Sequence, residues 1–126
     1  MNQYDPSTEP DKQSWLEATE SERMAAVTGF HEEHDEGLDR KALTIHSAIH
    51  VIVENQLALG VELLPDTVAK LVRQGLSRHE AIHAIGAIIS GDILGMIRGE
   101  ITEFSASKYR RKLEKISAKR WRKGKY

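Results

Sequence analysis

The sequence predicts an all-α protein, a compact bundle of about five helices. Apolar residues recur three and four positions apart along most of the chain, as at Met24, Val27 and Phe30. Residues typical of helix starts and ends stand between these stretches, and we find neither a convincing strand nor an internal repeat. The 126 residues are enough for one modest domain.

The first 13 residues are polar and contain Pro6 and Pro10, so we expect a mobile lead-in. A first helix should follow it. A capping box at either Ser14 or Thr19 would open this helix, because each is followed three residues later by a glutamate. Gly37 is the expected stop.

The clearest helix lies in the segment KALTIHSAIHVIVENQLALG. It is apolar around most of its circumference, which predicts that it is buried. The turn from Gly60 to Pro65 should end it, and a short helix from Thr67 to Gln74 should follow. The apolar positions of the long helix are Leu43, Ile45, Ile49, Ile52, Val53 and Leu57.

Ser77 and Glu80 match a second capping box, which would open the helix RHEAIHAIGAIISGDILGMIRG. Its small residues between 86 and 99 leave room for a neighbouring backbone, so this stretch is a candidate surface for a homo-oligomer. A final helix is expected over residues 101–120, with apolar positions at Ile101, Phe104, Tyr109, Leu113 and Ile116.

The net charge of −1 hides three zones of different charge. Residues 1–40 hold 11 acids and three bases, residues 41–104 seven acids and five bases, and residues 105–126 one acid and ten bases. We therefore expect a lead-in at 1–13, a helical domain at 14–104 and a basic C-terminal helix and tail at 105–126.

The chain contains no cysteine, which excludes disulfides, iron–sulfur clusters and thiolate zinc sites. The best apolar run, Ala42 to Val53, is short of the roughly 20 residues that a transmembrane helix needs. The polar start does not resemble a secretory signal. We expect a cytoplasmic protein without a membrane partner.

The six histidines form three pairs, with spacings of three, four and four residues. Each spacing places both imidazoles of a pair on one helical face. The pairs are His31 and His34, His46 and His50, and His79 and His83.

The central pair belongs to the pattern His46-x-x-x-His50-x-x-x-Glu54. Two neighbouring members could hold one ion, but the outer two lie about 12 Å apart along a helix. A wet polar face is the plainer interpretation. It is weakened by the surrounding apolar residues, because a buried carboxylate such as Glu54 needs a partner.

The later pair lies in the segment HEAIH, which fits the zinc motif H-E-x-x-H. In that motif two histidines, here His79 and His83, bind the metal and the glutamate, here Glu80, is the general base. The structural context of a metalloprotease is missing, and Glu80 has an ordinary role as capping partner of Ser77. Glu80-x-x-His83 also matches half of a carboxylate-bridged di-metal site.

Taken together, the pairs predict a metal site between the central helix and the His79 helix. Imidazoles and carboxylates without thiolate suit divalent zinc, iron, manganese or nickel. His31 is a peripheral candidate, whereas His34 sits in the acidic segment HEEHDE and is better explained as solvated. The predicted ligands are His46, His50, Glu54, His79 and His83, with Glu80 as a candidate general base.

The tail at 105–126 interleaves ten bases with Tyr109, Trp121 and Tyr126. Such a segment could bind phosphate backbones and stack on bases. It could equally be the solvated face of an amphipathic helix, or dock on an acidic partner or on the acidic front of this chain.

The segments HSAIHVIVENQLALG and GLSRHEAIHAIGAII resemble a family of small bacterial proteins known only as a domain of unknown function. The resemblance runs from about Phe30 to Ile97. It implies an all-helical fold with a His-rich centre, and a histidine after an aromatic residue, here His31. It implies no activity, and it leaves the acidic start and the basic tail uncovered.

Two functions of different class remain. The first is a metal-binding helical domain with hydrolytic or oxygen chemistry at the ion. The alternative is a non-enzymatic, oligomeric interaction module, in which the histidines and glutamates form a buried hydrogen-bond network and the basic tail contacts nucleic acid.

Overall fold

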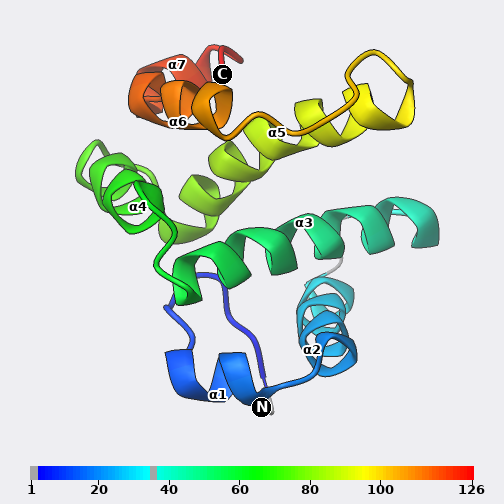
Figure 1. Cartoon of the computed structure of the whole chain (residues 1–126). Helices are drawn as coiled ribbons and strands as arrows, with labels where there is room; N and C mark the ends of the chain where they lie inside the picture. Colours follow the sequence, from blue (N-terminus) through cyan, green and yellow to red (C-terminus); the bar gives the residue numbers. More distant parts are fainter. Residues whose placement is uncertain (1–2, 35–36) are drawn as a thin grey trace. The chain divides into compact units, whose positions relative to one another are not determined.

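The protein is all-α, as predicted, in a computed structural model that describes residues 3–34 and 37–126 (Figure 1). These residues form seven helices and no strand. Five helices have seven or more residues, and two are shorter. The helices are α1 (Lys12–Glu17), α2 (Glu20–Glu33), α3 (Arg40–Ala58), α4 (Leu64–Arg73), α5 (Arg78–Ile97), α6 (Ala106–Lys115) and α7 (Ala118–Arg122).

The chain divides into two compact units, Met1–Gly60 and Val61–Tyr126. This division differs from the predicted one at 1–13, 14–104 and 105–126. The lead-in contributes to the core of the first unit, and the basic C-terminal segment packs on the helices of the second. The predicted division followed changes in charge along the sequence. The observed units instead depend on which apolar side chains pack together.

In the first unit, α1 and α2 both pack against α3 (Figure 1). Asp11 caps α1 by accepting a hydrogen bond from the backbone of Ser14. Thr19 and Glu22 form the capping box of α2, which decides between the two predicted boxes. Helix α2 ends at Glu33, before the expected stop at Gly37.

The lead-in is anchored by Tyr4, whose side chain is only 5% exposed. The tyrosine packs in a core with Trp15, Val27 and Val51, and Phe30 lies against that core. Its ring centroid is 5.9 Å from that of Trp15 and 6.2 Å from that of Phe30. The expectation of a mobile segment at 1–13 therefore does not describe Tyr4.

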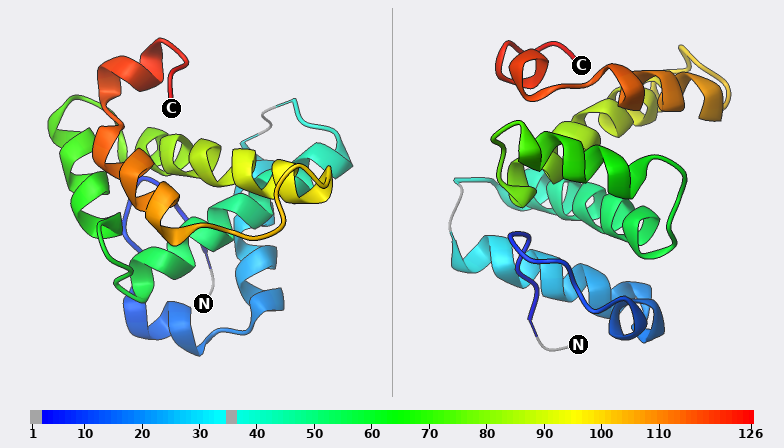
Figure 2. Two further views of the ribbon diagram at one scale, coloured as in Figure 1. Left: turned by 45° about the horizontal axis from the view of Figure 1, so that its top comes forward. Right: turned by 90° about the vertical axis from the view of Figure 1, so that its left-hand side faces the viewer.

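In the second unit, α6 packs against both α4 and α5 (Figure 2). The capping box of Ser77 and Glu80 opens α5 as predicted. The short helix α4 starts at Leu64, three residues before the expected start, with Pro65 in its first turn, a position that suits proline.

The single final helix predicted over 101–120 is wrong, because the chain forms α6 and α7 instead. Ile116 is extended, with φ of −62° and ψ of 140°, and buries its side chain. Ser117 then caps α7 by accepting a hydrogen bond from the backbone N–H of Arg120. The side chain of Gln74 accepts a hydrogen bond from the backbone N–H of Ala118, which fixes α7 at the end of α4.

Two apolar features depart from the expectations. Ile45 on α3 is 54% exposed, although its spacing predicted burial, and Phe104 is also exposed. Helix α5 is long and apolar enough to cross a bilayer by length and composition, although the sequence suggested no such segment. Core helices of soluble proteins meet the same criterion, and eight of the 20 residues of α5 are buried in the protein.

Candidate metal centre

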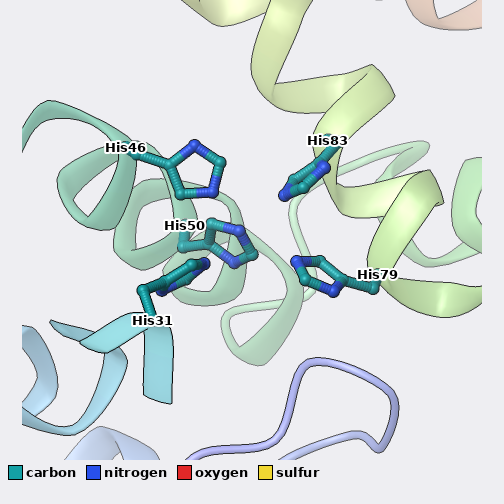
Figure 3. Close-up of side chains that lie close together, drawn as sticks. All are labelled: His31, His46, His50, His79 and His83. Carbon is teal, nitrogen blue, oxygen red and sulfur yellow. The ribbon is translucent and has the colours of Figure 1, made fainter. Parts of the chain in front are cut away.

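Three imidazoles of the first unit meet at the crossing of α2 and α3. Helix α2 supplies His31, and α3 supplies His46 and His50 (Figure 3). Their ring centroids lie 4.6 to 4.9 Å apart, and their ligand nitrogens lie within 4.8 Å of one another. These three side chains could hold a metal ion. We call them the histidine triad.

The triad lies in the interior of the protein. His31 is 2% exposed and His50 is 1% exposed, while His46 is half-buried. His31, predicted to be peripheral, is thus an equal member of the group. The four-residue spacing of His46 and His50 turns both rings to one face of α3, as the sequence indicated.

A hydrogen bond sets the tautomer of His31. Its Nδ1 lies 2.8 Å from the carbonyl oxygen of Val27, one helical turn earlier. A carbonyl oxygen only accepts hydrogen bonds, so Nδ1 must carry the proton. In the neutral ring the lone pair is then on Nε2, which is the nitrogen that can bind a metal.

Glu54 has the partner that its burial requires, and this partner is Tyr4. The carboxylate is 2% exposed, and its Oε2 accepts a hydrogen bond of 2.6 Å from the Tyr4 hydroxyl. The same hydroxyl lies 3.1 Å from Nδ1 of His50. Glu54 is thus linked to the ligand candidate His50 through the Tyr4 hydroxyl.

In the second unit, His79 and His83 lie one turn apart on α5. Their ring centroids are 4.3 Å apart, and both side chains are half-buried (Figure 3). Glu80 between them is exposed, and its carboxylate accepts a hydrogen bond of 3.2 Å from the backbone N–H of Ser77. Glu80 therefore acts as the capping partner of α5.

The sixth histidine, His34, lies apart from the triad. It is exposed, stacks on Phe30 with a centroid distance of 4.0 Å, and donates from Nδ1 to the Phe30 carbonyl. The exposed position of His34 agrees with the expectation, drawn from the acidic residues around it, that this side chain is solvated.

Sequence reasoning missed Tyr4 altogether. The residue stands in a polar segment without helical periodicity, and its two partners lie 46 and 50 positions further along the chain. The one signal that pointed to it was the charge of Glu54 on an apolar helix, which predicted a partner without naming it.

No protein-family model matches this chain, and no curated protein and no solved structure is significantly similar to it.

Proposed function

We propose that this protein binds a divalent transition metal ion through His31, His46 and His50. The observation that carries the proposal is the gathering of three imidazoles from two helices, with their ligand nitrogens within 4.8 Å of one another. A tetrahedral zinc ion bonded at about 2.0–2.1 Å would bring such nitrogens to roughly 3.4 Å. Small rotations of the rings would achieve that approach.

The ligand type restricts the ion and its chemistry. Neutral imidazoles suit zinc, iron and nickel, and manganese is the least favoured of the predicted metals without carboxylate ligands. Three protein ligands leave a coordination position open, as in catalytic rather than structural zinc sites. We place the proposed hydrolytic or oxygen chemistry at that position, where an ion activates water or binds a small substrate.

The predicted participation of His79 and His83 stays part of the proposal. The pair offers the same kind of ligand at a spacing that suits one ion, and neither side chain is fully solvated. Two imidazoles alone make a weak site. That this pair shares the ion with the histidines of α3 therefore stays a prediction from the sequence, and the titration below tests it.

The test measures metal content and affinity in protein purified without a histidine tag. We expect about one ion per chain by elemental analysis, and a saturable titration with Zn²⁺ or Co²⁺ after chelation. His50→Ala should lower the affinity at least 100-fold because it removes one of three core ligands. His50→Gln, which preserves side-chain bulk, repeats the test should the alanine variant not fold. His34→Ala and Glu80→Gln should bind like the wild type.

The same titration decides the role of the α5 pair. His79→Ala/His83→Ala should bind one ion with lower affinity, whereas two ions per wild-type chain would make the pair a separate site. A folded, metal-free protein that ignores Zn²⁺, Co²⁺ and Fe²⁺ would contradict metal binding. It would favour the alternative, a buried hydrogen-bond network in an interaction module.

A second candidate function rests on the basic region at residues 105–126. We propose that this surface binds nucleic acid. Tyr109, Leu113 and Ile116 bury one face of the segment, which leaves Lys108, Arg111 and Lys115 exposed along the other face of α6. Further on, Trp121 packs against Tyr126 with a centroid distance of 5.4 Å.

The salt dependence of RNA binding tests this candidate. Binding should weaken as salt rises, with a log–log slope that reports the number of phosphates neutralised. Lys108→Gln/Arg111→Gln/Lys115→Gln should reduce that slope by about 3. The control variant is Lys12→Gln/Arg40→Gln/Lys41→Gln, which removes three exposed cations from the first unit. The slope of the control should equal that of the wild type. Binding that is absent, or insensitive to salt, would contradict the proposal.

A further inference from the structure

We infer that Tyr4 is a positioning residue, which together with Glu54 holds His50 in the tautomer that offers Nε2 to the metal. The inference rests on the proposed function, because it assigns a task to side chains beside the proposed ligands. The observation behind it differs from the one that carries the proposed function. It is the chain of hydrogen-bonding atoms that runs from Glu54 through the Tyr4 hydroxyl to His50.

The Tyr4 hydroxyl has one proton and lies within hydrogen-bond distance of both Glu54 and His50. Oε2 of Glu54 lies 2.6 Å away and Nδ1 of His50 lies 3.1 Å away. A carboxylate can only accept, and the distance to it is the shorter one, so the hydroxyl proton belongs on the bond to Glu54. The contact with His50 is then a hydrogen bond only if Nδ1–H donates to the tyrosine oxygen.

This assignment has a direct result for the ring of His50. With its proton on Nδ1, the neutral imidazole carries its lone pair on Nε2. His31 is held in the same tautomer by the Val27 carbonyl. Two members of the triad thus carry their proton on Nδ1. A backbone carbonyl holds this tautomer in His31, and a carboxylate acting through a tyrosine holds it in His50. Such partners of metal-bound histidines fix the ring and raise its basicity.

Aromatic contacts hold the ring of Tyr4 in place, so its hydroxyl stays between Glu54 and His50. Its ring lies edge-on to His50, with an interplanar angle of 84°, and edge-on to Phe30, at 86°. It is also tilted against Trp15. Because these contacts involve the ring and not the hydroxyl, Tyr4→Phe should preserve the packing while it removes the hydrogen-bonding oxygen.

The experiment compares Tyr4→Phe with wild-type protein and with Tyr109→Phe. The control makes the same chemical change at a tyrosine of equal burial, 5% exposed, in the second unit. We expect Tyr4→Phe to lower the affinity for Zn²⁺ or Co²⁺ about 10- to 100-fold. The control should bind within about twofold of wild type.

A readout without metal separates positioning from general stability. Nitrogen-15 NMR of the ring in metal-free protein reports which nitrogen of His50 is protonated. We expect Nδ1–H in the wild type and in Tyr109→Phe, and a mixture with Nε2–H in Tyr4→Phe. Glu54→Gln should also produce a mixture, because an amide donates as well as accepts and no longer claims the tyrosine proton.

The outcomes distinguish the two proposals. If wild type binds metal and Tyr4→Phe matches it in both affinity and tautomer, the inference is overturned while the metal site stands. If wild type binds no metal, the proposed function fails. The NMR spectrum then still decides whether Tyr4 sets the tautomer of His50. Nε2–H as the main tautomer in wild type would overturn the inference in either case.

Discussion

Trp15→Ala is expected to lower the free energy of unfolding by about 3–5 kcal/mol, the usual cost of truncating a buried aromatic residue. Trp15 is 1% exposed and contacts Tyr4 in the core of the first unit. Its Nε1–H donates a hydrogen bond of 2.9 Å to Asn55 on α3, and the guanidinium of Arg23 lies 5.8 Å from its ring. The substitution removes packing, a hydrogen bond and a cation–π contact together.

Urea unfolding followed by far-ultraviolet circular dichroism measures this loss without relying on tryptophan fluorescence. The matched control is Trp121→Ala, which truncates the second tryptophan, a half-buried residue near the C-terminus. We expect it to cost about 1 kcal/mol, because less apolar area leaves the core. A Trp15→Ala protein as stable as the control would show that the first unit does not depend on this side chain.

A bound metal ion is expected to stabilise the protein by an amount set by mass action. With free metal at 100 times the dissociation constant, the folded state gains about 2.7 kcal/mol, provided that the unfolded chain binds little. The midpoint of thermal unfolding should therefore rise with metal concentration. In His31→Ala/His50→Ala it should not, because two of the three triad ligands are gone.

Thermal unfolding with increasing Zn²⁺ or Co²⁺ measures this linkage. His34→Ala is the control, since it removes an exposed histidine from the same helix end and leaves the triad intact. Its midpoint should rise in parallel with that of wild type. An equal rise in the double variant would place the metal elsewhere and contradict the assignment of the triad.

The parts of the fold that the sequence predicts are those with local signals. Helices α3 and α5 have long apolar stretches, α5 also has the predicted capping box at Ser77, and both hold their histidines on one face as the spacing indicated. The break between α6 and α7 was not predictable in the same way. The segment around Ile116 contains neither glycine nor proline, and the break depends on a contact between Gln74 and Ala118.

The sequence predicted a histidine site and two of the three triad residues as central ligands, but it did not predict the central place of His31 or the contact with Tyr4. His46 and His50 were identified because their helix and spacing fix their common face. The acidic segment HEEHDE indicated a solvated position for His34, which is indeed exposed, and His31 in the same segment was predicted only as a peripheral candidate. One residue of that end still turns inward, which only the packing of α2 on α3 determines. Tyr4 depends on contacts almost 50 positions away, which a local pattern does not contain.

The division of the chain at Gly60 also bears on the order of events during synthesis. Each unit is one continuous stretch of the chain, and the helices that pack together within it are neighbours or next neighbours in sequence. Folding from such local contacts is fast, and N-terminal units fold first as they leave the ribosome. The histidine triad with Tyr4 and Glu54 is complete within the first 60 residues. Metal loading could therefore precede translation of α5 and of the basic C-terminal helices.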